Sequence, residues 1–352
     1  MSRELLNTLF VMTQGAYVHL ENETAKVVLR QSQDGRLDET VLLQTPLHHL
    51  GSIVTFGNVM MSPQLMHKCA AEGRTVSFLS MSGRFLARVV GPVSGNVLLR
   101  QAQYEACRDP SRCAATARSI VAGKVHNLRS VLLRAAREAS DSEAKADLGR
   151  SAEWLASYLT RLRDARDIDE IRGYEGQASA DYFAVFDSMI LAQRTGFRFA
   201  SRNRRPPRDR VNALLSFLYA MVLNDCIAAS EGVGLDPQFG YLHALRSGRP
   251  ALALDLMEEF RPVLAERLAL NLINRQQLKP DHFDVRPGGS VLLNEDGRKL
   301  VVASYQKRKQ AEVNHPMLKT KTPLGLVPHL QARILARHLR GDLRDYFPYY
   351  PR

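Results

Sequence analysis

The chain has 352 residues, which is long for a single hydrophobic core, so two domains are expected. Hydrophobic residues make up 45% of the chain, which excludes a disordered protein, and a formal net charge of +12 favours a polyanionic partner. Residues 1–95 are nearly neutral, so the excess positive charge and any polyanion site are expected after them. A basic protein whose charges are only solvated is the alternative.

The four cysteines show no CxxC pair and no zinc-binding spacing, which favours reduced thiols in a cytoplasmic protein. The N-terminal sequence does not resemble a signal peptide. The most apolar stretch, residues 211–223, is too short to cross a bilayer and is expected to be part of a buried core helix. We therefore expect no association with a membrane.

Residues 1–95 predict a small β-rich domain. Two apolar runs, residues 16–20 and 25–29, flank a polar turn and predict a hairpin, and further strands are expected at residues 52–56, 76–79 and 85–90.

One helix is expected to interrupt these strands. Ser62 can cap its first turn, Pro63 suits the first helical position, and Gly73 can end it.

Residues 96–110 are expected to link this domain to a larger one, residues 111–352, in which apolar residues recur at helical spacing. Helices are expected there at residues 152–163, 178–193, 211–230, 252–273 and 327–340, and a short hairpin at residues 288–297. The predicted fold class is therefore α+β, with a β-rich N-terminal domain and a mostly α-helical C-terminal domain.

The sequence contains no Walker A motif, no glycine-rich dinucleotide turn, no GxSxG elbow and no HExxH helix. The enzyme classes that depend on these motifs are therefore unsupported. If the protein is an enzyme, its chemistry must come from carboxylates, histidine and a metal ion.

The densest acidic cluster is DLMEE, which begins at Asp255 and ends with Glu258 and Glu259. Residues three and four apart share one helix face, so these like charges repel one another and a bound cation would relieve the repulsion. A solvated acidic face is the alternative and, on spacing alone, the more frequent one.

Two further candidates stand apart from this cluster. His243 precedes the acidic helix in the segment GYLH, and Glu175 lies between two glycines at an expected helix entry. Each has an ordinary structural explanation, because a single histidine is usually not a ligand and an acid favours the N-terminal end of a helix.

The segment of residues 194–210, RTGFRFASRNRRPPRDR, contains seven arginines and one acid. Arg202, Arg204 and Arg205 are candidate contacts to the DNA backbone, and the interleaved Phe197 and Phe199 suit stacking on unpaired bases. A charged linker is the alternative.

Six ordered segments resemble the CRISPR-associated integrase and endonuclease family of the spacer-acquisition (adaptation) module, and its subtype I-C branch most of all. They are LLNTLFV, IVTFGN, SFLSMSGRFLARVVGPVSGNVLLRQAQY, IRGYEG, NRRPPRDRVNALLSFLY and LALDLMEEFRP. The resemblance extends from residue 5 to about residue 345, and six segments in order are more specific than any one motif.

This resemblance implies a dimerising N-terminal β domain and a helical catalytic domain. The family's metal site is a glutamate, a histidine and a second acid, which by motif position fall on Glu175, His243 and Glu258. Asp255 is similar to a neighbouring acid that supports the site, and Arg261 is a candidate phosphate contact. The second acid is aspartate in many relatives, whereas glutamate stands here.

The resemblance also implies Mg²⁺ or Mn²⁺ as cofactor, both of which suit carboxylates with one imidazole. Its expected partners are DNA (double-stranded, branched, with 3′ ends), a second copy in a homodimer, and a second CRISPR adaptation protein in a larger complex. In the expected reaction, a 3′-hydroxyl attacks a phosphodiester of a CRISPR repeat and inserts new spacer DNA, which needs no nucleotide fuel. A structure-selective repair nuclease for branched DNA and a non-catalytic DNA-binding scaffold are the alternatives.

Overall fold

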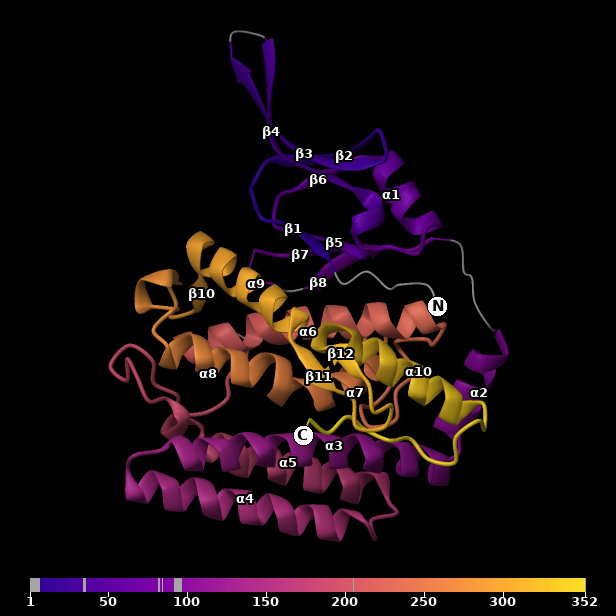
Figure 1. The fold of residues 1–352 in the computed structure, drawn as a ribbon, viewed down its shortest axis with the longest axis vertical. Helices are drawn as coiled ribbons and strands as arrows, with labels where there is room; N and C mark the ends of the chain where they lie inside the picture. Colours follow the sequence, from indigo (N-terminus) through magenta and orange to yellow (C-terminus); the bar gives the residue numbers. More distant parts are fainter. Residues whose placement is uncertain are drawn as a thin grey trace. The chain divides into compact units, whose positions relative to one another are not determined.

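The computed structural model describes residues 7–33, 36–81, 83, 85–91, 97–204 and 206–351. The chain divides into two compact units, residues 1–94 and residues 95–352 (Figure 1). The first unit is built on two β-sheets and the second is mostly helical. The predicted α+β class is confirmed.

In its described residues the first unit contains two four-stranded sheets, with strand orders β1-β5-β7-β8 and β4-β3-β2-β6. Its elements are β1 (Thr8–Val11), β2 (Ala16–Glu21), β3 (Thr24–Gln33), β4 (Arg36–Pro46), β5 (Ser52–Phe56), β6 (Met60–Met61), α1 (Pro63–Ala71), β7 (Thr75–Leu79) and β8 (Phe85–Val89). The predicted hairpin is β2–β3, whose turn residues Asn22 and Glu23 both have positive φ, as a tight hairpin turn requires. Strands β1, β4 and β6 were not predicted from the sequence.

Helix α1 begins where the sequence predicts. The Ser62 side chain accepts a hydrogen bond from the Leu65 amide at 3.2 Å, and Pro63 occupies the first turn. Leu65 and Cys69 are fully buried in a core that includes Val18 and Ile53 of the sheets. The helix therefore joins the two sheets around one hydrophobic core.

The second unit consists of nine α-helices and two short hairpins within the described part of the chain. These elements are α2 (Val97–Arg108), α3 (Pro110–Glu138), α4 (Ser142–Leu162), α5 (Ile168–Ala184), α6 (Arg210–Val233), α7 (Ala251–Phe260), α8 (Arg267–Asn274), β9 (Phe283–Val285), β10 (Val291–Leu293), α9 (Glu295–Gln310), β11 (Glu312–Asn314), β12 (Lys321–Pro323) and α10 (Val327–Leu339). The hairpin predicted at residues 288–297 corresponds to β9–β10, whose second strand is the Val291–Leu293 run. Most of residues 96–110, which we expected to be a linker, form α2, because Leu99, Gln103 and Ala106 are buried.

Four of these helices begin at an aspartate whose side chain accepts hydrogen bonds from amides of the first turn. The capping residues of α3, α4, α5 and α6 are, in order, Asp109, Asp141, Asp167 and Asp209. Such caps satisfy amides that have no partner within the helix, and the negative charge suits the positive end of the helix dipole. Helix α6 ends at Gly234, whose φ of 91° is accessible mainly to glycine.

Helix α6 is the central helix of the second unit and packs against α7 and α10. It is long and apolar enough to cross a membrane by length and composition, with a mean hydropathy of 1.6 over its most apolar window. However, 67% of that window is buried inside the protein, as in the core helix of a globular unit. The expected buried core helix is confirmed, although it is longer than the apolar stretch that indicated it.

The single helix expected over residues 252–273 is interrupted. Helices α7 and α8 are joined by a π-helical turn, Arg261–Glu266, with Pro262 at its start. Proline has no amide hydrogen, and its ring clashes with the carbonyl four residues earlier, so a regular α-helix cannot continue through it. The wide turn therefore follows directly after the acidic cluster at the end of α7.

The aromatic C-terminal segment, residues 346–350, packs into the second unit, which the sequence alone does not indicate. Tyr346 and Tyr349 are buried, and the Asn127 side chain of α3 donates hydrogen bonds to the carbonyls of Glu259 (2.8 Å) and Tyr349 (3.0 Å). The buried Glu259 carboxylate accepts hydrogen bonds from the Tyr346 hydroxyl (2.5 Å) and the Tyr349 amide (2.8 Å). The segment thereby ties the end of α7 to the middle of α3.

We predict that Gly123→Ala destabilises the second unit. A Cβ atom at this position of α3 would lie 2.7 Å from Cβ of Pro348 and 3.2 Å from Cγ of Glu259, so the segment would have to move. The expected loss in the free energy of unfolding is about 1–3 kcal/mol, measured by urea denaturation. Gly149→Ala on α4 is the matched control, because nothing lies within 4 Å of its Cβ. There, alanine should raise stability by about 0.5–1 kcal/mol. Equal stability of Gly123→Ala and wild type would contradict this packing.

Candidate active site

The buried carboxylate of Asp255 fixes the loop that carries His243. It accepts hydrogen bonds from the amides of Tyr241 (2.5 Å), Leu242 (3.0 Å) and His243 (3.0 Å), and its Oδ1 lies 2.6 Å from Nδ1 of the His243 ring. Asp255 is fully buried, so both of its oxygens are committed to this loop. The acid predicted to support the site therefore lies where it orients the histidine.

Gly240 allows this loop to approach α7 closely. A Cβ atom there would lie 2.6 Å from both the backbone carbon of Ala251 and Oδ2 of Asp255, so a larger residue would force the loop away. On its other side, the thiols of Cys107 and Cys113 donate hydrogen bonds to the carbonyls of Gly240 (3.2 Å) and Tyr241 (3.4 Å). All four cysteines have free thiols, as expected.

The orientation of His243 sets the role of its second nitrogen. An ionised carboxylate can only accept, so the ring donates to Asp255 from Nδ1, and the neutral ring then has its lone pair on Nε2. Nε2 lies 3.7 Å from Oε1 of Glu258, which is too long for a hydrogen bond. Histidine metal ligands are commonly oriented by a carboxylate in this way.

Glu258 is buried beside two cations. Its Oε1 lies 2.9 Å from Nη1 of Arg261, and its Oε2 lies 2.7 Å from Nζ of Lys124. Burial acts against ionisation of this carboxyl, but Arg261, Lys124 and His243 outweigh it and lower its pKa to about 2. Glu258 is therefore a buried anion.

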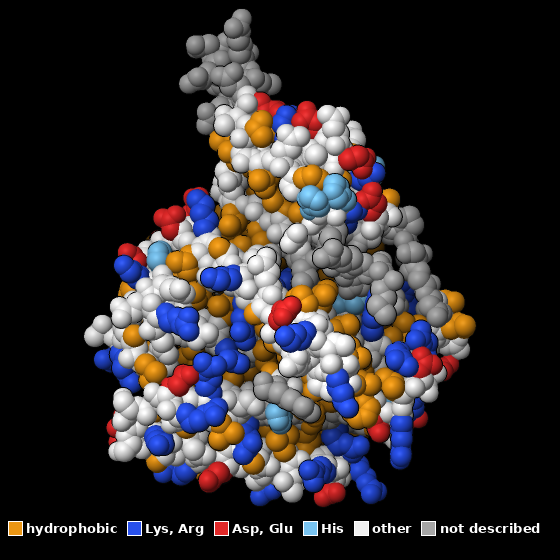
Figure 2. All heavy atoms as spheres, viewed as in Figure 1, with side chains coloured by type: hydrophobic (Ala, Val, Ile, Leu, Met, Phe, Trp, Pro, Cys, Tyr) orange, Lys and Arg blue, Asp and Glu red, His pale blue; other side chains and the backbone are white. Residues whose placement is uncertain are grey.

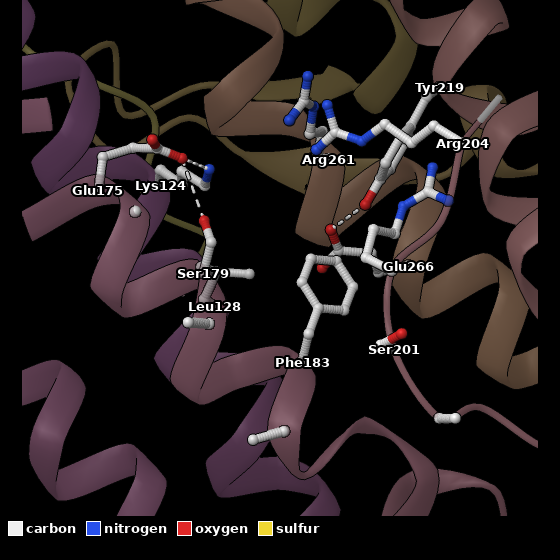
Figure 3. Close-up of a pocket in the computed structure, with 15 residues that line it drawn as sticks. Lys124, Leu128, Glu175, Ser179, Phe183, Ser201, Arg204, Tyr219, Arg261 and Glu266 are labelled. Carbon is white, nitrogen blue, oxygen red and sulfur yellow. Dashed lines mark hydrogen bonds and ion pairs between the residues drawn. The ribbon is translucent and has the colours of Figure 1, made fainter. Parts of the chain in front are cut away.

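Glu175 lies in the middle of α5, and not at a helix entry as the sequence suggested. The glycines on either side of it continue the helix, which begins at Ile168 because Asp167 caps it. The Glu175 carboxylate pairs with the ammonium of Lys124 and accepts a hydrogen bond from the Ser179 hydroxyl at 3.1 Å. Lys124 therefore bridges Glu175 and Glu258 (Figure 3 shows its contact with Glu175).

Glu175, His243 and Glu258 thus lie in one neighbourhood on three separate elements, with Lys124 between the two glutamates and His243 3.7 Å from Glu258. Among the described residues, no three His, Cys, Asp or Glu side chains converge closely enough to hold a metal ion, because the Lys124 ammonium separates the two glutamates. The donor set still fits a hard divalent cation, since it contains two carboxylates and an imidazole nitrogen that faces one of them. The bridging ammonium also shows that this position favours a cation.

A cavity of about 500 Å³ opens beside these residues. Glu175, Lys124 and Arg261 line one part of it, and Arg204 and Glu266 line another (Figure 3). Tyr219 connects several of the lining residues. Its hydroxyl donates a hydrogen bond to Glu266 at 2.6 Å. The guanidinium groups of Arg202 and Arg261 lie over its ring, 5.2 Å and 5.0 Å from the ring centre. The cavity therefore combines positive charge with an aromatic surface.

The predicted DNA-contacting arginines differ in their environments. Arg202 donates from Nη1 to the Asn203 carbonyl (2.7 Å) and to Oδ1 of Asn212 (2.5 Å), so its guanidinium is engaged within the protein. Arg204 is exposed and lines the cavity, and Arg205 lies outside the described residues. Arg261 is buried beside Glu258.

The expectation that Phe197 and Phe199 stack on unpaired bases is wrong. Both rings are buried, with exposed fractions of 1% and 4%. Phe197 packs edge-on against Phe283, and Phe199 packs against Phe183 and Phe186. Aromatic residues interleaved with arginines suit a binding surface, but here they anchor the segment to the hydrophobic core.

On the face of the second unit shown in Figure 2, basic side chains are spread widely among uncharged ones, and acidic side chains are sparse. The sequence places the excess positive charge in this part of the chain. A face of this kind suits contact with a polyanion.

Three residues of this site are not among those predicted from the sequence: Lys124, Tyr219 and Glu266. A signal for Lys124 was present, because it follows Ile120 by four residues and precedes Leu128 by four, on the apolar face of α3. A lysine at such a position is buried only if a counter-charge meets it. Glu266 follows Glu259 by seven residues, a spacing that shares one face of the expected helix, whereas no spacing relates Tyr219 to the acidic cluster.

Comparison with known proteins identifies the family. Residues 9–307 match the family described as CRISPR associated protein Cas1. The chain belongs to the Cas1 family. It is 54% identical to a CRISPR-associated endonuclease Cas1 from Moorella thermoacetica, over 98% of each chain. It is 49% identical to another from Rhodospirillum rubrum, over 99% of each chain.

Solved structures share the fold of this Cas1 family member. A CAS1 protein from Thermotoga maritima superposes with a TM-score of 0.77 at 22% identity, covering 97% of this chain and 99% of that one. A casposase bound to its integration product superposes with a TM-score of 0.79 at 21% identity, covering 97% of this chain and 92% of that one. At these identities the likeness concerns the fold alone.

We predict that Asp255→Asn destabilises the protein and disorders His243. An amide has one acceptor oxygen and turns a donor toward backbone amides, so buried hydrogen bonds are lost. The expected loss in the free energy of unfolding is about 2–4 kcal/mol by urea denaturation. Asp236→Asn is the matched control on the segment between α6 and α7, where the partly exposed carboxylate accepts from the Tyr104 hydroxyl at 2.9 Å. Its loss should stay below about 1 kcal/mol. Equal losses in the two variants would contradict the special role of Asp255.

Proposed function

We propose that this Cas1 family member is a metal-dependent DNA integrase and endonuclease that inserts new spacer DNA into a CRISPR repeat array. The observation that carries the proposal is that Lys124 links Glu175 to Glu258 and that His243 Nε2 lies 3.7 Å from Glu258. Glu175, Arg204 and Arg261 line the cavity beside this group. Two acids and an oriented imidazole beside positive charge suit chemistry at a phosphodiester.

The similar proteins support this proposal. The relatives from Moorella thermoacetica and Rhodospirillum rubrum are named CRISPR-associated endonucleases, and both match the chain almost from end to end. The casposase that shares the fold was solved with an integration product. We further assign the chain to the subtype I-C branch, on the six sequence segments described above.

Glu175, His243 and Glu258 would hold the metal ion, with Mg²⁺ or Mn²⁺ as the candidates. When bound, such an ion stabilises negative charge on the attacked phosphate and lowers the pKa of the attacking hydroxyl. The chain's own residues supply the rest. Asp255 keeps the Nε2 lone pair of His243 directed at the site, and Arg261 adds a fixed positive charge next to Glu258.

The remaining parts of the chain have proposed roles as well. We propose that the second unit is the catalytic domain, and that the β-rich first unit forms a homodimer. Within the first unit, the long strand β4 exposes Val41, Leu42 and Leu43, and exposed apolar residues on a sheet edge favour pairing with another chain. We also propose that the protein works in the cytoplasm in a larger complex with a second adaptation protein.

The proposal predicts that the enzyme runs the reaction backwards on a branched DNA that resembles a half-integrated product. Integration conserves the number of phosphodiester bonds, so reversal should need Mg²⁺ or Mn²⁺ but no ATP. It should restore an intact strand beside a released 3′-hydroxyl, seen on a denaturing gel with labelled DNA. Glu258→Gln should abolish rejoining, because it removes a ligand charge. Glu295→Gln, the same change at an exposed glutamate of α9, is the control.

The outcome also separates the alternatives. A hydrolytic repair nuclease would use water as the attacker and give only shorter strands, and a scaffold would leave the DNA unchanged. Shorter products alone, with both metals and several branch designs, would replace the integrase assignment with a repair nuclease.

A second prediction concerns Arg204, the exposed arginine at the cavity. If it contacts a phosphate, Arg204→Ala should weaken DNA binding regardless of sequence and flatten the dependence of log K on log salt by about one unit. Fluorescence anisotropy at several salt concentrations measures both. Arg150→Ala on α4, which removes an exposed arginine paired with Asp147, should leave the slope unchanged. Equal slopes for Arg204→Ala and wild type would remove Arg204 from the DNA contact.

A further inference from the structure

The ammonium of Lys124 lies between the two carboxylates that we propose as metal ligands. It pairs with Glu175, and its Nζ is 2.7 Å from Oε2 of Glu258. Only 4% of this lysine is exposed, so its charge is compensated mainly by these two partners. A metal ion that binds both glutamates therefore has to compete with Lys124.

The charges at this place are already balanced. Lys124 and Arg261 carry two positive charges, and Glu175 and Glu258 carry two negative ones. The carboxylate of Asp255 accepts hydrogen bonds from backbone amides and pairs with the His243 ring. Its negative charge is therefore not available to a metal ion between Glu175 and Glu258. While Lys124 and Arg261 stay in place, a divalent cation would add two positive charges to a partly buried site without added negative charge, which is unfavourable.

The acid on the opposite side of the cavity does not correct this imbalance. Glu266 is buried and accepts a hydrogen bond from Tyr219, and burial raises the pKa of its carboxyl, which favours the neutral form. The negative charge needed with a metal ion must therefore come from outside the protein. DNA phosphates supply such charge in the proposed reaction.

The cavity provides space into which the Lys124 side chain can move. Its volume is about 500 Å³, and Lys124, Ser201 and Arg204 all line it. A lysine has a flexible four-carbon stem and a compact charge, so it can exchange one anionic partner for another inside the same space.

We propose that Lys124 is a displaceable internal cation that couples metal binding to DNA binding. In the free protein it holds Glu175 and Glu258 together. When a DNA phosphate enters the cavity, the ammonium moves onto the phosphate and leaves the two carboxylates to the metal ion. The inference rests on the proposed metal site, and it makes the binding of metal and DNA mutually favourable.

The test is the affinity of the full-length protein for Mn²⁺, measured by electron paramagnetic resonance of free Mn²⁺, with and without a short DNA duplex carrying a 3′ overhang. Wild type should bind Mn²⁺ about tenfold more tightly with DNA than without it. Lys124→Met should bind Mn²⁺ about tenfold more tightly than wild type without DNA, and DNA should then add less than about threefold. Lys309→Met is the control, because Lys309 is an equally buried lysine whose Nζ lies 3.0 Å from Asp225. It should behave as wild type.

Folding of the variants is followed by thermal melting with and without Mn²⁺, and Lys124→Gln keeps a polar group if Lys124→Met does not fold. The wild-type comparison with and without DNA needs no variant. An unchanged wild-type affinity for Mn²⁺ on adding DNA would overturn the proposal, as would Lys124 variants that bind Mn²⁺ like wild type. No Mn²⁺ binding by wild type even with DNA would overturn the metal site as well. Loss of DNA-dependent Mn²⁺ binding in Glu258→Gln supports the site independently of the lysine.

Discussion

The candidate active site depends on the carboxylate of Asp255, which is fully buried and has no contact with solvent. Asp255 receives three backbone amides and the His243 ring, and thereby joins a loop to the helix that carries Glu258. A buried anion of this kind is stable only while all of its donors are present, because each missing donor leaves part of the charge uncompensated. The loop, the tautomer of the histidine and the spacing between histidine and glutamate therefore follow from one set of hydrogen bonds. These hydrogen bonds require glycine at position 240, because any side chain there would collide with Asp255.

The sequence predicts those parts of the fold that are set by local patterns. Alternating apolar residues give the β2–β3 hairpin, and a serine followed by a proline gives the start of α1. The pattern fails where a proline interrupts it or where a long-range contact decides the structure. Residues 252–273 have a continuous apolar face, yet Pro262 breaks the helix into α7 and α8 with a π-helical turn. Helix α2 lies in a stretch that was expected to be a linker. Its buried side chains contact distant segments, and Gln103, for example, donates hydrogen bonds to the carbonyls of Asp236 and Phe239. Contacts of this kind cannot be predicted from the local sequence.

For the site, spacing within one helix could show only that Asp255 and Glu258 share a face. Glu175 and His243 lie 83 and 15 residues before Glu258 in the sequence, and only tertiary packing brings them near. The family resemblance predicts that these three residues form one site, whereas residue patterns alone do not. Lys124 shows the opposite case, because its charge on an apolar helix face was visible without any relative. The arginine segment was predicted in part, since the sequence cannot distinguish an exposed arginine such as Arg204 from one that bonds inward, as Arg202 does.

The hydrogen bonds of Asn127 have a consequence for the order in which the protein acquires its structure. This side chain joins residues separated from it by 132 and 222 positions, Glu259 and Tyr349. Contacts between such distant segments form slowly, because the entropy of closing the intervening loops is lost before the contacts stabilise the chain. Glu258 is adjacent to one of these junctions, so we expect the proposed metal site to be completed late in folding. A partly folded chain would thus carry positive charge that attracts DNA without yet having the means to break it. For the proposed integrase and endonuclease, this order of assembly would keep an incompletely folded chain from cutting DNA.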